Sequence, residues 1–359
     1  MGGGNPGGPA GVSPGDTTSF SGVTTVPHST TVVGAALRPA LATVLAALAV
    51  SAAIGLPAAR AAAPAVDLQP QALARGADIA VPHLEDGVFV DGERRIELPG
   101  TDGDVLGASG AAWIAATWTN NRVGEQRRAR IVRVEPDGTV RTIFVGFESR
   151  WALLSEDGSR LVTMADSGYR RAAVTVRSAT DGSEVRSRVF DGWPQAVTAD
   201  DRKVVVQTMR RTVLWRVGPD RVRTVTRDAA GAVSIEHDLL ATSTNDPYIG
   251  GCTRLVRLSD PGTTVWRSCK ERVAAISPDG TQLLTFHILT DGVGPGRITL
   301  RTLRGKRLAT WTTGWFSDWQ WESPGTVLLE VNGSSRSATV RCTLAECENA
   351  TDPVKVTPP

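Results

Sequence analysis

The stretch Ala274–Thr285, A-A-I-S-P-D-G-T-Q-L-L-T, decides the fold. A short apolar segment leads into a Ser-Pro-Asp-Gly turn, and a second apolar segment follows it. Proline presets φ for the turn, while Asp and Gly tolerate the positive φ that closes it. The stretch therefore predicts a β-hairpin. A related copy, A-L-L-S-E-D-G-S-R-L-V-T, occupies Ala152–Thr163, so the hairpin is repeated along the chain.

Repeated units of four short strands account for most of the chain beyond Gly76 when it is aligned on these two hairpins. Successive units begin roughly 37–47 residues apart, which is about the period of four-stranded propeller blades. Turns with Gly and Asp separate the first strand from the second and the third from the fourth, where backbone geometry alone requires them. The six units are expected at 104–146, 151–190, 195–226, 232–268, 273–312 and 318–350.

The segment Ile79–Pro99 precedes the first of these units and contains two or three further strands. If the sixth unit is complete, this segment is a seventh, shortened blade. If the sixth unit lacks its outer strand, the segment supplies that strand and the ring has six blades. We favour seven blades in a single all-β propeller over residues 78–350, because radial stacking buries both faces of each four-stranded antiparallel sheet.

Three motifs carry a resemblance to a known family: S-P-D-G-T-Q-L-L, S-E-D-G-S-R-L-V, and W-x-W-E-S-P-G-T-V-L-L near the C-terminus. They resemble the TolB-type and WD-repeat-like secreted β-propellers of actinobacteria over about residues 78–350. The resemblance implies a secreted propeller. Binding proteins and enzymes share this architecture, so the resemblance is specific for the fold and not for a function.

The N-terminal region is expected to lie outside the propeller. Residues 1–36 are rich in Gly, Pro, Ser and Thr, and are either a disordered extension or the product of a start codon placed too early. Residues 37–61 are typical of a secretory signal peptide, with Arg38, an apolar run and an Ala-Arg-Ala site. An uncleaved N-terminal anchor is the alternative. Residues 62–77 are expected to be a linker and residues 351–359 a C-terminal tail.

The charges almost cancel, because 39 Lys and Arg face 37 Asp and Glu for a formal net charge of +2. Such a balance gives no electrostatic case for DNA, RNA or an anionic membrane surface. We expect a monomer that is secreted, extracellular or associated with the cell envelope. It is expected to bind no nucleic acid, and no membrane unless the signal stays uncleaved.

The four cysteines are an even number in a chain expected to be secreted. Cys252 and Cys269 lie symmetrically about the turn between the third and fourth strands of the fourth unit. Cys342 and Cys347 are symmetric about the equivalent turn of the sixth unit. Opposed residues of an antiparallel pair lie within disulfide range. The strand register therefore predicts the bridges Cys252–Cys269 and Cys342–Cys347, in preference to a metal site or free thiols.

Recognition is expected on the face that carries the loops between second and third strands and the links between units. These loops are long and uneven: Asn120–Arg128, Asp166–Arg170, Asn245–Gly251, Thr290–Gly296 and Asn332–Ser337. Loops of this kind on a rigid scaffold commonly carry binding sites. Trp151, Trp193 and Trp315 fall at the links, where indole rings stack on ligands or wedge between blades. The predicted ligand-binding residues are Trp151, Trp193, Trp315, Trp319, Asn120, Asp166, Tyr169, Asp246, Tyr248, Asp291 and Asn332.

Catalytic groups are hard to find in the sequence. There is no G-x-S-x-G motif of a propeller-linked peptidase, and His83, His237 and His287 lack metal-ligand spacing. His287 sits among apolar residues and is expected to be buried. The cluster Glu236-His237-Asp238 near an inner strand has acid–base chemistry, with a structural role as the alternative. We expect no catalytic residue, no metal and no cofactor.

Arginines are concentrated in the third unit, where they are expected to form a charge ladder on an outer edge and to oppose strand-to-strand aggregation. These residues are Arg210, Arg211, Arg216, Arg221 and Arg223.

The functional hypothesis is a secreted, non-catalytic propeller that binds a protein, peptide or glycan through the long-loop face. The alternative is a hydrolase or lactonase-like enzyme with an acidic site, with or without a divalent cation, at the channel mouth. Its carboxylates would come from Asp166, Glu236, Asp246, Asp291 and Asp318.

Overall fold

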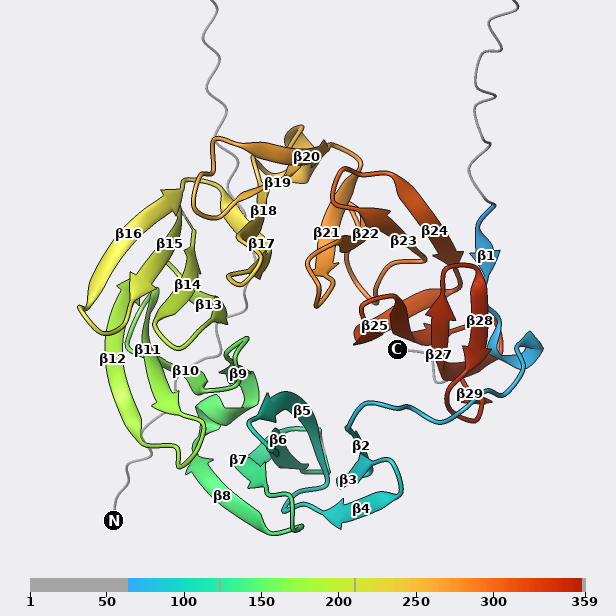
Figure 1. The fold of residues 1–359 in the computed structure, drawn as a ribbon, viewed down its shortest axis with the longest axis horizontal. Helices are drawn as coiled ribbons and strands as arrows, with labels where there is room; N and C mark the ends of the chain where they lie inside the picture. Colours follow the sequence, from blue (N-terminus) through green and yellow to red (C-terminus); the bar gives the residue numbers. More distant parts are fainter. Residues whose placement is uncertain (1–63, 123, 210, 357–359) are drawn as a thin grey trace, which may run out of the picture. The chain divides into compact units, whose positions relative to one another are not determined.

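The computed structural model describes residues 64–122, 124–209 and 211–356, and within these ranges almost all regular structure is β-strand. The strands form seven separate sheets that follow one another around a ring (Figure 1). The chain is therefore an all-β, seven-bladed propeller, as the repeats predicted. The expected N-terminal extension and signal peptide, residues 1–61, lie outside the described residues.

Each blade is an antiparallel sheet whose strands run in chain order from the ring's inner side outward. Blade 1 contains β5 (Asp102–Ser109), β6 (Ala112–Asn120), β7 (Gln126–Val134) and β8 (Val140–Val145). Blade 2 contains β9 (Leu153–Leu154), β10 (Arg160–Asp166), β11 (Arg171–Ser178) and β12 (Glu184–Asp191). Blade 3 contains β13 (Gln195–Ala199), β14 (Lys203–Thr208), β15 (Arg211–Arg216) and β16 (Arg221–Thr226). Blade 4 contains β17 (Ala229–Ser234), β18 (Leu239–Ser243), β19 (Thr253–Arg257) and β20 (Thr264–Ser268).

The remaining blades are less regular. Blade 5 contains β21 (Glu271–Ile276), β22 (Gln282–His287), β23 (Arg297–Thr302) and β24 (Arg307–Thr312). Blade 6 contains β25 (Trp315–Ser323), β26 (Thr326–Asn332), β27 (Arg336–Thr343) and β28 (Glu346–Asn349). Blade 7 has three strands, β2 (His83–Glu85), β3 (Val88–Asp91) and β4 (Arg94–Glu97). Because β28 completes blade 6, the N-terminal strands form the shortened seventh blade.

The hairpin that identified the repeat is closed by its own side chains. In the turn between β21 and β22, the buried Ser277 hydroxyl accepts the backbone N–H of Gln282 at 2.9 Å and donates to Asp279 at 2.6 Å. Thr281 donates its hydroxyl to the other oxygen of Asp279 at 2.8 Å. These bonds, led by the one from Ser277, hold the pKa of Asp279 below its usual range. The turn of blade 2 repeats the arrangement with Ser155, Asp157 and Ser159.

The core lies between successive sheets. The central strands are buried on both faces, so they are continuous apolar runs rather than alternating ones. In β15 the four residues between two exposed arginines are all buried, and Trp215 is fully enclosed. Trp215 packs with Val162, Val174 and Val204 of blades 2 and 3, so the blades are held together chiefly by aliphatic contacts.

Between blades 6 and 7 no strand is exchanged within the described residues, and an ion pair of blade 6 also binds the backbone of the segment that leads into blade 7. Arg341 of β27 donates through Nη2 to the Glu322 carboxylate at 2.7 Å, and both side chains are largely buried. Arg341 also donates to the carbonyl oxygens of Ala77 at 2.8 Å and Asp78 at 2.7 Å. Glu322 accepts the backbone N–H of Ala80 at 2.8 Å. We call Arg341 and Glu322 the clasp, because they hold the segment leading into blade 7.

The described part of the segment expected to be a linker packs along blades 5 and 6. Strand β1 (Val66–Asp67) pairs in parallel with β24, Val66 opposite Trp311, and Leu68 is fully buried. Asn349 donates its side-chain amide to the carbonyl of Pro70 at 2.8 Å. In the segment expected to be a C-terminal tail, β29 (Val354–Lys355) pairs with β27. Both ends of the described chain therefore add to the sheets.

Both predicted disulfides are present, Cys252–Cys269 with a Cα–Cα distance of 4.0 Å and Cys342–Cys347 with 4.3 Å. Cys342 and Cys347 face each other in the register of β27 and β28. In the described ranges, no helix is long and apolar enough to cross a membrane.

Candidate functional site

Four large aromatic side chains stand out from the long-loop face over blades 1 to 3. Phe147 and Trp151 lie in the short 3-10 helix η2 (Phe147–Trp151), which links blade 1 to blade 2. Tyr169 lies between β10 and β11, and Trp193 lies between β12 and β13. Their exposed fractions are 65%, 56%, 77% and 57%. We call these four residues the aromatic rim.

The first half of the aromatic rim is built around Arg150. The rings of Phe147 and Trp151 meet edge to face with centroids 5.1 Å apart. The Arg150 guanidinium lies over both, 3.4 Å from the Phe147 centroid and 4.4 Å from that of Trp151. Its hydrogen bonds go to neutral acceptors, the Phe147 carbonyl and the Gln126 side chain. A cavity of about 400 Å³ opens beside Phe147 and Arg150.

The second half pairs Tyr169 with Trp193, whose ring centroids are 6.1 Å apart, and Arg170 lies 4.7 Å over the Tyr169 ring. Trp193 has φ +56° and Arg170 has φ +61°, a conformation that is unfavourable for residues with a side chain. The Arg170 carbonyl accepts the N–H groups of Gly192 at 2.7 Å and Trp193 at 3.1 Å. Backbone hydrogen bonds within blade 2, between the β10–β11 loop and the residues that follow β12, thus fix the backbone that carries these two rings.

A second group of predicted residues meets over blades 4 and 5. The Tyr248 hydroxyl donates to Asp291 at 2.9 Å, joining loops of adjacent blades. This hydrogen bond raises the pKa of Tyr248 above its usual value. Asp246 accepts the backbone N–H of Tyr248 at 2.9 Å at the start of the 3-10 helix η3 (Pro247–Ile249). All three polar side chains are therefore engaged in fixing the loops.

The other predicted residues are not gathered into one site. Trp315 and Trp319 lie within β25, which begins earlier than expected, and both are half-buried. Trp319 packs on Phe286 with ring centroids 5.4 Å apart, which fits the wedge alternative. The remaining polar residues make local hydrogen bonds: Asn332 to Ser317, Asn120 to Asp102, and Asp166 to the backbone of Gly168.

Carboxylates gather in blades 1 and 6, where sequence reasoning had singled out only Asp318. Asp104 lies on β5, Asp318 on β25 and Glu330 on β26. Desolvation by the surrounding sheets raises the pKa of all three, and the charge of Asp318 adds to the effect on the other two. Among the residues that the structure describes, no three His, Cys, Asp or Glu side chains are placed to hold a metal ion.

The residues Glu236, His237 and Asp238 form a turn rather than a strand, and each of them makes a separate structural contact. The Glu236 N–H donates to Glu156 at 2.9 Å, and His237 Nε2 lies 2.7 Å from the Pro278 carbonyl oxygen. Asp238 accepts the Ser259 hydroxyl at 2.7 Å. The expectation that His287 is buried is wrong: it ends β22 at the rim of blade 5 and is exposed.

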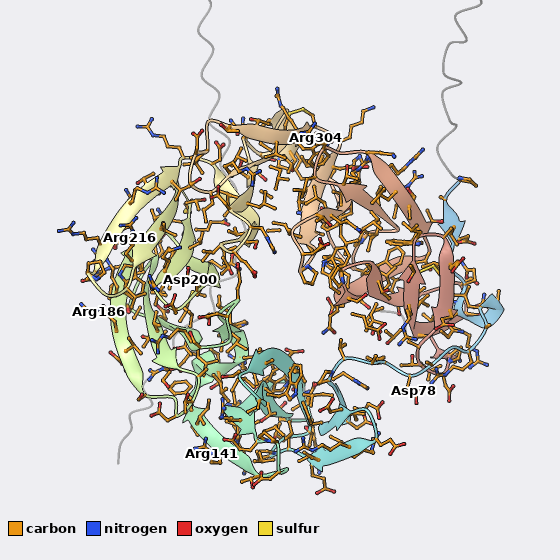
Figure 2. The ribbon with its side chains drawn as sticks, viewed as in Figure 1. Asp78, Arg141, Arg186, Asp200, Arg216 and Arg304 are labelled. Carbon is orange, nitrogen blue, oxygen red and sulfur yellow. A yellow bond between two sulfur atoms is a disulfide. The ribbon has the colours of Figure 1, made fainter. Side chains whose placement is uncertain are left out.

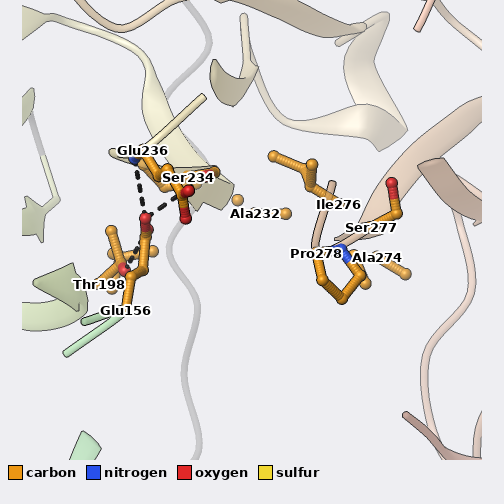
Figure 3. A pocket seen from close by; sticks show the side chains of 13 residues that line it. Glu156, Thr198, Ala232, Ser234, Glu236, Ala274, Ile276, Ser277 and Pro278 are labelled. Carbon is orange, nitrogen blue, oxygen red and sulfur yellow. Dashed lines mark hydrogen bonds between the residues drawn. The ribbon is translucent and has the colours of Figure 1, made fainter. Parts of the chain in front are cut away.

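Glu156 was not identified from sequence, although it connects three blades. It lies on the face that carries the short turns between first and second strands and between third and fourth strands, which we call the tight-turn face. From the blade 2 turn it accepts the Thr198 hydroxyl of blade 3 at 2.9 Å. It also accepts the backbone N–H groups of Ile235 and Glu236 of blade 4, at 2.8 and 2.9 Å. Figure 3 shows the bonds from Thr198 and Glu236 to Glu156 at the edge of a cavity of about 570 Å³ whose wall includes Ala232 and Ala274. A contact across some 80 residues leaves no local sequence signal.

The comparisons with known proteins support the fold. The chain matches no protein-family model and no curated protein. It is similar in structure to the acylaminoacyl peptidase of Pyrococcus horikoshii, with TM-score 0.54 and 12% identity over 74% of this chain and 47% of that one. A chain of a mitotic checkpoint complex gives TM-score 0.50 and 16% identity over 72% and 81%. TolB from Acinetobacter baumannii gives TM-score 0.44 and 11% identity over 67% and 63%. At these identities the first two likenesses show the β-propeller fold alone.

Proposed function

We propose that this protein is a secreted, monomeric, non-catalytic propeller that binds a protein, peptide or glycan through the aromatic rim. The observation that carries the proposal is the exposure of four large aromatic side chains on one face, each more than half accessible to solvent. Exposed apolar groups gathered in this way are typical of interaction sites. Trp, Tyr and Arg are also the residues that contribute most to binding interfaces.

The arginines of the rim strengthen the proposal. Arg150 and Arg170 stack on rim aromatics, and no described carboxylate forms an ion pair with either. A guanidinium held flat on a ring keeps donors available at its edge for carboxylate or hydroxyl acceptors of a partner. Peptides and acidic glycans offer both these acceptors and apolar surfaces for the rings.

The rim is tested by replacing Trp151 and Trp193 together with alanine. Extracellular proteins and an array of glycans are offered to the wild type and to the variant. We expect the double variant to lose at least about tenfold in affinity for the captured partner, because two exposed anchors are removed. Tyr248→Ala is the matched control, since Tyr248 is 64% exposed on the same face over blade 4. A partner retained by the double variant and lost by the control would contradict the rim assignment.

Secretion is tested separately on the expressed full chain. The apolar run before residue 61 and the even cysteine count support export, and the chain contains two disulfides. We expect protein recovered from the medium or cell envelope to begin after Ala61 by N-terminal sequencing. Recovery of the intact N-terminus from the cytoplasm would contradict this part of the proposal.

A second candidate function is a hydrolase or lactonase with an acidic site at the channel mouth. The observation favouring it is the raised pKa of Asp104 and Asp318, because such shifts are common among catalytic carboxyls. Turnover of a panel of lactones and esters that disappears in Asp318→Asn supports the enzyme. Absence of turnover with the whole panel, with and without divalent cations, supports the binding protein.

A further inference from the structure

A basic cavity opens on the tight-turn face between blades 2 and 3, on the opposite face from the aromatic rim. Its volume is about 590 Å³. Its wall is formed by the starts of β10, β12 and β14 with the turn before β14, and by the end of β15 with the turn after it. We call it the basic pocket. Its charged residues are Arg160, Arg186, Arg202, Lys203, Arg216 and Asp201.

The cations of the basic pocket outnumber the carboxylates that could neutralise them. Lys203 pairs with Asp200 at 3.0 Å, and Arg202 pairs with Asp201 at 3.0 Å. Arg186 lies 4.0 Å from Asp220, the limit of an ion pair. Asp220 is already engaged, because it accepts from Arg188 at 2.8 Å and from the Trp215 indole at 2.9 Å.

Two guanidinium groups remain without a described carboxylate. Arg160 makes one long hydrogen bond, from Nε to the Asp201 carbonyl at 3.4 Å. Arg216 is exposed at the end of β15 and forms no ion pair or side-chain hydrogen bond with a described residue. Figure 2 shows Arg216 and Arg186 on the adjoining blades. Of the predicted arginine ladder, Arg221 and Arg223 do lie on the outermost strand of blade 3, whereas Arg216 faces this pocket. Arg210 is outside the described residues.

The rest of the wall is apolar. Val217 is buried beneath the pocket, Val185 is 45% exposed beside it, and Pro219 forms part of its edge. A cavity of this size that combines apolar surface with a few charged groups fits a small organic ligand. Several unpaired guanidinium donors favour a tetrahedral oxyanion, because phosphate and sulfate offer more acceptor oxygens than a carboxylate and bind arginine through paired hydrogen bonds.

We propose that the basic pocket is an anion-binding site for a phosphate or sulfate monoester that carries an apolar group. Arg160 and Arg216 donate to the oxyanion, with Arg186 adding charge from blade 2. The apolar group contacts Val185 and Pro219. This site is independent of the aromatic rim, and ligands can occupy both at once.

The test is isothermal titration of the full-length protein with 1-naphthyl phosphate and 1-naphthyl sulfate, each at low and at physiological salt. We expect saturable binding at one site, weakened by salt. Arg160→Gln and Arg216→Gln should each weaken it about tenfold or more, since each removes a charge-assisted pair of hydrogen bonds. Arg304→Gln is the matched control: Arg304 is an exposed arginine in a tight turn of blade 5, so the same charge is lost away from the pocket.

Two further experiments distinguish a lipid headgroup from a soluble ligand, and binding at the basic pocket from binding at the aromatic rim. Phosphatidylcholine vesicles with and without phosphatidic acid distinguish a lipid headgroup from a soluble monoester, and either result supports the site if Arg216→Gln abolishes it. The Trp151→Ala, Trp193→Ala double variant should bind naphthyl phosphate as the wild type does. The proposal is overturned if no probe binds saturably, or if Arg304→Gln weakens binding as much as Arg216→Gln.

Discussion

On the tight-turn face, the Ser and Asp side chains of the repeated hairpin motif are bonded within their own turns. Ser277 and Asp279 are an example, each with hydrogen bonds inside the same hairpin. On the long-loop face, Trp193 and Arg170 occupy unfavourable backbone conformations and leave their side chains accessible. The first face has the sharper sequence motif and the second has the stronger indication of binding.

In this propeller the most conspicuous sequence motif is structural, because its residues close the turns on which the blades depend for folding. Recognition residues are dispersed over several links and loops, where no repeat exists to reveal them. The basic pocket is an exception to this division between the faces, because it lies among tight turns and yet contains arginines without a carboxylate partner.

The largest effect is expected when alanine replaces Gly280. Gly280 and Gly292 have φ of +66° and +67° in the same blade, but they lie on opposite faces. A Cβ at Gly280 would lie 2.3 Å from His237 Cγ, whereas one at Gly292 meets nothing within 4 Å. We expect Gly292→Ala to cost about 1 kcal/mol of unfolding free energy from backbone strain, and Gly280→Ala about 3 kcal/mol or more because the clash adds to it. Urea unfolding of both variants measures the difference, and equal costs would contradict the close contact.

The two disulfides provide the next comparison, since Cys342–Cys347 closes a tight turn and Cys252–Cys269 joins the long-loop ends of its strands. Their sequence separations are 5 and 17 residues. Loop entropy in the unfolded chain predicts a loss of about 2 kcal/mol for the Cys342→Ala, Cys347→Ala pair and about 3 kcal/mol for the Cys252→Ala, Cys269→Ala pair. Denaturant unfolding gives both values. A larger loss from the shorter loop would show that packing of the buried Cys342 outweighs loop entropy.

Substitutions at Trp193 test whether the side chains of the aromatic rim serve binding without contributing to the stability of the fold. Glycine at position 193 relieves the strain of φ +56°, whereas alanine retains it. We expect Trp193→Gly to be more stable than Trp193→Ala by about 1 kcal/mol, with partner binding lost in both. Thermal unfolding and the binding assay measure the two properties. If both variants lose several kcal/mol, the indole is a wedge between blades and the division between the faces fails.

The smallest effect concerns pH. Desolvation raises the folded-state pKa of Asp318, so the folded chain binds more protons than the unfolded chain between the ordinary value of 3.8 and the raised one. Its contribution to stability therefore falls as pH rises through that window. Asp279 has the opposite sign: hydrogen bonding lowers its pKa, so its stabilisation is present above 3.8 and is lost as pH falls through the lowered value.

We accordingly expect Asp318→Asn to raise the thermal midpoint at pH 7 by no more than about 1 °C, because Asp318 is exposed and solvent screens its charge, and Asp279→Asn to lower it. Near pH 3, where Asp318 is protonated in both the folded and unfolded chains, the stabilisation by Asp318→Asn should vanish. Thermal scans at both pH values supply the data. A lower midpoint for Asp318→Asn at pH 7 would show that a partner compensates this carboxylate.

The sequence predicts the blades well because their signals are local. Ser277, Asp279 and Gly280 determine a turn within a few residues, and the register that follows places Cys342 opposite Cys347. The incorrect expectation for His287 came from the same reasoning, since its apolar neighbours indicate a buried strand but do not show where the strand ends.

Contacts between blades were not predictable in this way. Glu156 reaches across to Glu236, and the clasp residue Arg341 binds the Ala77 carbonyl 264 residues away. Arg150 and Phe147 were missed because an isolated Arg or Phe in a link resembles any other surface residue. Whether these two side chains form part of a binding surface depends on where the neighbouring blades place them, which no local sequence pattern encodes.

The pairing of β1 with β24 also sets an order of events during synthesis. Val66 leaves the ribosome 246 residues before Thr312, which it contacts in the finished ring. At about 5–20 residues per second, the first strand waits on the order of 10–50 s for its partner. Until then the residues of blades 5 and 6 that surround Leu68 in the folded chain have not all been made, and the outer edge of blade 5 does not yet exist. A nascent chain that stops before blade 6 also lacks Arg341 and Glu322. Blade 6, which is made last, therefore supplies the residues that hold the segment leading into blade 7, which is made first.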